Sequence, residues 1–265
     1  MLLIKPYFMM SPLHYCVVIL MVVSIWSIAI PHSHAESVAT EQAAHQGTSM
    51  HGHDEGHHWE GSMEGKAYSE RNHWLAGIFL LFIGYGEWRA AGGKATGWGQ
   101  ALVPAALLAC GVFLLIWSDH EAWPIGHMGF METLSGDHPE ILQHKLIGLM
   151  SIVVGAIEAG RRSRQLLNAG WEYVLPAYAI VGGLMLLAHE HGPHPSGHQI
   201  DQHHTLMAAL AIAAAVAKGL TLWSASSQPG DPSAPRMGLP LKLVGSRIWA
   251  SIIVALGLVL LLYRE

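Results

Sequence analysis

The segment QALVPAALLACGVFLLIWS, residues 100–118, contains no charged side chain. At a rise of about 1.5 Å per residue, a helix of this length crosses the roughly 30 Å hydrocarbon core of a bilayer. The composition of the whole chain agrees, since 51% of its 265 residues are hydrophobic and only 12% are charged. Five further apolar stretches lie at 73–88, 141–160, 171–188, 205–223 and 243–263. The sequence therefore predicts an all-α integral membrane protein with a six-helix transmembrane bundle.

The first 72 residues differ from this bundle in composition. Residues 1–35 are typical of a signal peptide, with Lys5 ahead of an apolar stretch and the small-x-small sequence Ser33-His34-Ala35 at its end. Residues 36–72 are rich in Gly, Ser, Glu and His and show no apolar periodicity, which predicts a disordered His-rich tail. The six-span membrane domain is then expected to cover residues 73–265.

The positions of Lys and Arg predict the orientation of the spans. The segments after the first, third and fifth spans contain Arg89, Lys94, Arg161, Arg162, Arg164, Arg236 and Lys242. The loops 119–140 and 189–204 contain no Lys or Arg, so the positive-inside rule places them outside. All 16 histidines beyond residue 36 then lie on that outer side, beside Asp and Glu residues that attract a cation.

Composition also excludes several classes of protein. The net charge of −5 argues against nucleic acid as a partner. Cys16 and Cys110 lie in separate apolar stretches, so they form neither a disulfide framework nor a Cys-based zinc site. The chain has no Walker A motif, which leaves any transport passive or driven by an ion gradient. We predict that the protein is not an enzyme.

A repeated pattern connects the first, third and fifth spans. Each begins with a histidine, followed four residues later by a small residue and fourteen residues later by a charged one. The three sets are His73, Gly77 and Glu87; His144, Gly148 and Glu158; and His204, Ala208 and Lys218. The other spans end alike, in LLIWSDHE (114–121), LMLLAHEH (184–191) and LVLLLYRE (258–265). This pattern predicts three repeated helical hairpins, with the small residues permitting close helix approach.

The repeat has consequences for both ends of the bundle. Packing around a pseudo-threefold axis would bring His73, His144 and His204 to a similar depth near the outer surface. The charged residues lie roughly 21 Å deeper by helical rise, on the same helix faces. They are expected to form either a Glu–Lys pair inside the bundle or a set of inner exit ligands or a proton path.

The two outer loops hold the other candidate ligands. Imidazole nitrogen suits copper and zinc, and the thioether sulfurs of Met128 and Met131 favour Cu(I). The predicted metal ligands are His73, His120, His127, His138, His144, His189, His191, His203 and His204. Copper, as Cu(I) or Cu(II), is the expected ion, and zinc is the alternative. The tail would act as a low-affinity collector of the metal.

Several short runs, in this order, resemble the membrane region of the bacterial copper resistance D family. They are Trp123–Gly126, Met128–Glu132, Leu142–His144, the His-x-His of His189 and His191, and the final LLLYRE. The resemblance covers roughly residues 73–265. It implies an inner-membrane protein of copper transfer or tolerance. With the outer loops on the periplasmic side, we also expect a periplasmic copper carrier as a partner. The matching ligands are His144, His189, His191 and His204.

Two other interpretations use the same histidines. A helical bundle with histidines on facing spans can hold b-type haem, although axial pairs normally lie within helices, and here only His144 lies clearly inside one. A membrane hydrolase with a catalytic zinc would need three ligands and a general base such as Glu190. The chain contains no His-Glu-x-x-His motif that would favour the hydrolase. Copper handling is therefore the favoured interpretation.

Overall fold

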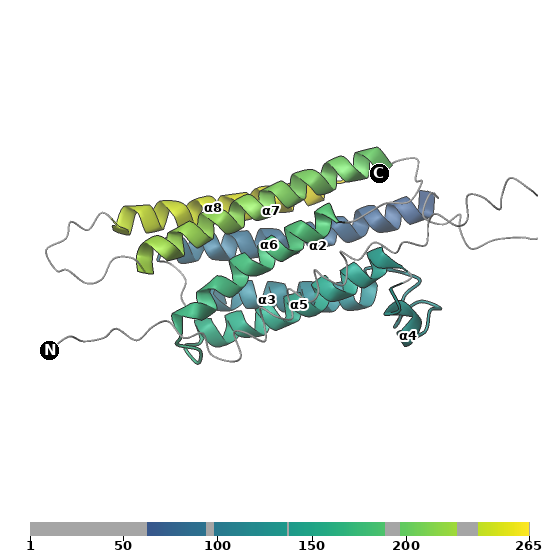
Figure 1. Ribbon diagram of the computed structural model, residues 1–265, viewed down its shortest axis with the longest axis horizontal. Helices are drawn as coiled ribbons and strands as arrows, with labels where there is room; N and C mark the ends of the chain where they lie inside the picture. Colours follow the sequence, from purple (N-terminus) through teal and green to yellow (C-terminus); the bar gives the residue numbers. More distant parts are fainter. Residues whose placement is uncertain (1–62, 94–97, 137, 189–196, 227–237, 265) are drawn as a thin grey trace, which may run out of the picture.

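The computed structural model describes residues 63–93, 98–136, 138–188, 197–226 and 238–264. These residues form the long helices α2 (Met63–Ala91), α3 (Trp98–Trp117), α5 (Pro139–Arg162), α6 (Val174–Leu187), α7 (Gly197–Ser226) and α8 (Gly238–Leu261) (Figure 1). A short helix, α4 (Phe130–Thr133), precedes α5, and a 3-10 turn, η1 (Ala169–Tyr173), leads into α6. No strand occurs in these ranges, so the predicted all-α fold is confirmed for the described part of the chain.

Five of the helical segments are long and apolar enough to cross a membrane. They are Trp98–Trp117, Pro139–Arg162, Ala169–Leu187, His198–Ser224 and Leu243–Leu261. Each coincides with a stretch that the composition predicted. The helix α2 is not among them, because its 29 residues carry charges at both ends and leave only a short apolar stretch. The structure is thus compatible with a multi-pass membrane protein, with α2 as a sixth helix of the bundle.

The start of α2 differs from the prediction. The helix begins at Met63, whereas the sequence predicted disorder up to residue 72. Contacts with α3 explain the difference, since the Tyr68 hydroxyl donates to the Trp117 carbonyl at 2.6 Å and the Asn72 amide donates to the Ser118 carbonyl at 3.0 Å. These contacts come from a distant part of the chain and cannot be read from local composition. The predicted signal peptide and the rest of the tail lie outside the described residues.

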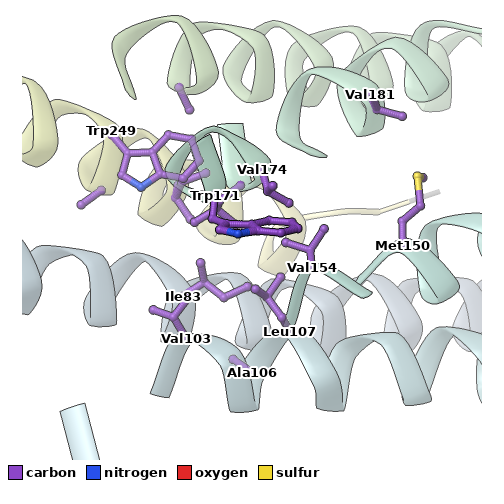
Figure 2. Packing of buried hydrophobic residues seen from close by; sticks show 14 of the residues in the cluster. Ile83, Val103, Ala106, Leu107, Met150, Val154, Trp171, Val174, Val181 and Trp249 are labelled. Carbon is purple, nitrogen blue, oxygen red and sulfur yellow. The ribbon is translucent and has the colours of Figure 1, made fainter. Parts of the chain in front are cut away.

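The six long helices pack in chain order around a closed ring. Each contacts the one before and after it, and α8 closes the ring against α2. The most extensive contacts join α2 to α8 and α3 to α5. Figure 1 shows α7 and α8 along one side of the bundle, α3 and α5 along the other, and α2 and α6 between them. The interior contains a continuous apolar cluster, which includes Ile83, Val103, Leu107, Val154, Trp171 and Trp249 (Figure 2).

Small residues sit where neighbouring helices approach most closely. A Cβ atom added to Gly77 would lie 2.8 Å from the Gly257 carbonyl oxygen of α8, and one added to Gly148 would lie 3.0 Å from the Gly111 oxygen of α3. A Cβ on Gly183 of α6 would lie 3.1 Å from the Ala208 oxygen of α7. The predicted role of Gly77, Gly148 and Ala208 in close helix packing is therefore confirmed. The same type of contact recurs three times around the ring, while the hairpin repeat itself stays a prediction.

The close contact between α3 and α5 should contribute to the stability of the protein. The substitution Gly111→Ala is expected to lower the free energy of unfolding by about 1–3 kcal/mol, because the added Cβ would lie 2.6 Å from the backbone oxygen of Gly148. Gly182→Ala on α6 is the matched control, since nothing lies within 4 Å of the position of its Cβ. Thermal unfolding in detergent measures both. A Gly111→Ala protein as stable as the Gly182→Ala protein would contradict this packing.

Candidate functional site

The seven described histidines among the candidate ligands lie at one end of the bundle, which we call the histidine end. Helices α2, α5 and α7 begin at this end, and α3, α6 and α8 finish there (Figure 1). The other end contains Arg89, Arg161, Arg162 and Lys218, and we call it the basic end. The sequence predicted histidines at one end and Arg89, Arg161 and Arg162 at the other, although Lys145 and Arg264 also lie at the histidine end.

His73 and His203 contact Tyr263, just beyond the end of α8, and His204 lies near His73; we call these three imidazoles the imidazole cluster. The His73 ring stacks on the Tyr263 ring, with centroids 3.9 Å apart and planes 17° from parallel. His203 meets the same ring edge-on at 5.3 Å. The centroids of His73 and His204 are 6.3 Å apart, and His204 is only 6% exposed. Helices α2 and α7 therefore bring together three of the predicted ligands.

The hydrogen bond of His73 fixes its protonation form. Its Nδ1 lies 2.8 Å from the carbonyl oxygen of Ser69, one turn earlier in α2, and only an N–H can donate to that oxygen. The neutral ring with a proton on Nδ1 has its lone pair on Nε2. Metal-binding histidines commonly make such a bond through their second nitrogen, which fixes both the tautomer and the ring orientation. The bond of His73 to Ser69 is compatible with such a role.

His203 has a buried nitrogen that is not satisfied. Its Nδ1 has no hydrogen-bond partner among the described residues. A buried polar atom without a partner costs free energy, so native proteins rarely keep one unless a ligand or ion completes it. A water molecule or an ion could complete the Nδ1 atom of His203.

His144 lies in a different environment, beside Asp119 at the end of α3. Its Nδ1 donates to Asp119 Oδ1 at 2.8 Å, and the Ser118 hydroxyl donates to the same carboxylate. Lys145 Nζ lies 3.7 Å from Asp119 Oδ2 and donates to the Leu115 carbonyl at 3.0 Å. Burial acts to raise the pKa of Asp119, but His144, Ser118 and Lys145 outweigh it and hold that pKa below its usual value. Asp119 is therefore an anion that orients the His144 ring.

The first turns of α2 connect the two environments. Tyr68 and Asn72 face α3 and bond to the carbonyls of Trp117 and Ser118, whereas His73 faces α8. His120 packs edge-on against Tyr68 at 5.6 Å. Burial lowers the pKa of His120, and His127 acts in the same direction, whereas Glu121 and Asp119 act to raise it.

The remaining candidates are less closely associated. His127 is exposed, and His138 is half-buried where the chain enters α5. His189 and His191 lie outside the described residues. Within the described ranges, no group of three or more His, Cys, Asp or Glu side chains is arranged to hold a metal ion. The structure thus pairs His73 with His204 and places His144 beside Asp119, rather than showing the three in one group.

No known protein family, curated protein or solved structure matches this chain.

Sequence reasoning did not assign roles to Asp119 and Tyr263. Both nevertheless occupy the same position in the aligned ends of the second and sixth spans, five residues after Leu114 and Leu258. Each contacts the histidine at the start of the predicted span in the next helix around the ring, His144 and His73 respectively. The equivalent residue of the fourth span is His189, outside the described residues. The aligned ends of these spans could therefore have indicated Asp119 and Tyr263 as residues of the site. Doing so also requires knowing which helices are neighbours.

The basic end contains a buried network of charges centred on Glu87. This carboxylate is 4% exposed and accepts from Lys218 Nζ at 2.9 Å and from Trp249 Nε1 at 2.8 Å. Arg162 also donates to it. The predicted Glu–Lys pair inside the bundle is confirmed by the Glu87–Lys218 contact.

Glu158 extends this network. It is fully buried and accepts from Arg161 NH2 at 2.7 Å and from Arg162 Nε at 2.9 Å. Because Arg162 bonds to both Glu158 and Glu87, the three charged residues of the repeat belong to one network joining α2, α5 and α7. The network holds this end of the helices together.

Proposed function

We propose that the chain is an inner-membrane copper-handling protein that binds the ion through histidines at its periplasmic face. The observation that carries this proposal is the imidazole cluster, in which His73 is held in a ligand tautomer and His203 has an unsatisfied buried nitrogen. Copper is the substrate of the protein, which binds the ion and passes it on, either for copper resistance or for copper acquisition. The six spans, with α2 as the first, and the signal peptide are parts of this proposal.

The separation of His73 and His204 supports a shared ion. Metal–imidazole bonds of about 2.0 Å would place the centroids of two rings on one ion roughly 5 Å apart in a tetrahedral site and roughly 6 Å apart where the two nitrogens lie on opposite sides of the ion. The observed separation is 6.3 Å. Imidazole suits copper and also zinc, which remains the alternative ion. His144, His189 and His191 are proposed as further ligands from the sequence.

A haem is the second candidate, and the packing of Tyr263 disfavours it. The Tyr263 side chain is 1% exposed and contacts both His73 and His203. It fills space beside these rings that a porphyrin between two axial histidines would need. A single ion requires no such space.

The charge pattern supports the proposed orientation and route. Arginines at the basic end fit the cytoplasmic side, and the histidine end, with Asp119 as a buried anion, fits the periplasmic side. In our proposal the tail and the loops containing His120, His127 and His138 collect copper. The buried network at the basic end supports transfer to a periplasmic carrier rather than passage through the bundle.

Metal analysis of the purified chain tests this function. In mild detergent, we expect about one tightly bound copper per chain and no Soret band in the visible spectrum. Because protonated imidazole cannot ligate a metal, the copper should be released below about pH 6. A Soret band would favour haem, zinc as the only metal would favour the alternative ion, and copper retained at pH 5 would exclude histidine as the main ligand.

A further inference from the structure

The residues that follow α8 cover the imidazole cluster. Tyr263 stacks on the face of His73 and meets His203 edge-on, so one almost fully buried side chain lies against two of the three imidazoles. Helix α8 ends at Leu261, and the Tyr263 N–H donates to the Leu260 carbonyl at 3.2 Å. Movement of Tyr263 and Arg264 would break this one backbone hydrogen bond and leave the bonds of the preceding helix in place. We call these two residues the strap.

Contacts from α2 and α7 hold the strap in place. Arg264 NH1 lies 2.7 Å from Glu70 Oε2, and its guanidinium lies 4.4 Å above the Trp74 ring. The backbone is held as well, because Trp74 Nε1 donates to the Tyr263 carbonyl at 3.3 Å and Gln199 Nε2 donates to the Arg264 carbonyl at 3.1 Å. None of these contacts involves an imidazole of the cluster.

The strength of these contacts suits a reversible closure. The Arg264 side chain is 57% exposed, so water and salt screen its ion pair with Glu70. The ring of Tyr263, by contrast, is buried against the imidazoles. Packing of the Tyr263 ring against the imidazoles thus favours the closed position of the strap. The exposed contacts of Arg264 add only weakly to it.

We infer that the strap of Tyr263 and Arg264 closes the imidazole cluster and sets the rate at which a metal ion enters and leaves it. This inference rests on the proposed function, since it assigns a gate to the same site. Glu70, Trp74 and Gln199 act as the latch. The gate changes the rates at which the metal ion enters and leaves by the same factor. The equilibrium affinity for the ion depends on the imidazoles and is unchanged.

Chemical modification of histidines tests the closure without any metal. The full chain in detergent is treated with diethyl pyrocarbonate, and modification of His73 and His203 is followed by mass spectrometry relative to the exposed His127. The latch variants are Arg264→Ala and Glu70→Gln. Matched controls on α2 are Arg71→Ala and Glu64→Gln, which remove the same charges away from the strap. Loss of the guanidinium contacts is expected to speed modification of His73 and His203 by about tenfold, with His127 unchanged.

Copper exchange tests the gate itself. Transfer of Cu(I) to and from a chromogenic chelator is expected to be about tenfold faster in both directions in Arg264→Ala, with the dissociation constant within about twofold of the wild type. Tyr263→Phe retains the stacked ring and should keep wild-type rates. Latch variants with the modification and exchange rates of their controls would overturn the strap. Faster modification without copper binding to any protein would support the closure and refute the proposed function.

Discussion

Replacing Glu87 with alanine is expected to lower the free energy of unfolding by about 3–5 kcal/mol. The substitution removes the carboxylate that accepts from Lys218, Arg162 and Trp249. It leaves Lys218, whose side chain is only 16% exposed, without this partner. Arg162 keeps its bond to Glu158. The loss of stability arises mainly from the unpaired charge of Lys218, because no carboxylate then compensates its desolvation. Equilibrium unfolding in mixed detergent micelles measures the change.

Glu70→Ala is the matched control for this experiment. Glu70 also lies on α2 and also forms a salt bridge, but its partner Arg264 is mostly exposed. A screened surface pair contributes about 0–1 kcal/mol, so this variant should unfold nearly as the wild type does. A double variant, Glu87→Met with Lys218→Met, removes the charge and its partner together and is expected to recover much of the lost stability. If Glu87→Ala costs no more than Glu70→Ala, the network does not hold the basic end together.

The spans could be predicted from sequence because they depend on local composition. The stretch 100–118 lacks charges, and the structure has a helix at Trp98–Trp117. The spacing of Gly77, Gly148 and Ala208 also predicted close helix contacts, because fixed helical geometry determines which residues share a face. The pairing of Glu87 with Lys218 followed from the cost of burying either charge alone.

The details of the histidine end depend on which helices are neighbours. Asp119 orients His144 because α3 packs on α5, and Tyr263 covers His73 because α8 closes the ring against α2. The periodicity within one helix does not predict the contact between Tyr263 and His73, because these residues lie nearly 200 positions apart in the sequence. The start of α2 at Met63 was missed for the same reason, since Tyr68 and Asn72 are held by α3.

The double substitution His73→Ala and His204→Ala is expected to weaken copper binding by more than about 100-fold. Mutating even the hydrogen-bond partners of metal ligands typically costs 10–100-fold in affinity, and this variant removes two nitrogen donors. His127→Ala is the control, because that histidine is exposed and lies apart from the imidazole cluster. Competition with a Cu(I) chelator measures the affinities, and thermal unfolding shows whether each variant remains folded. Wild-type affinity in the folded double variant would exclude the imidazole cluster as the copper site.

We propose that histidine imidazoles at the histidine end bind copper in this protein. X-ray absorption at the copper edge of the copper-loaded wild-type chain tests these ligands. We predict two or three nitrogen donors at about 2.0 Å with the multiple scattering of imidazole rings, lost together in the His73→Ala and His204→Ala variant. A first shell of sulfur or of oxygen alone, without imidazole scattering, would contradict this proposal.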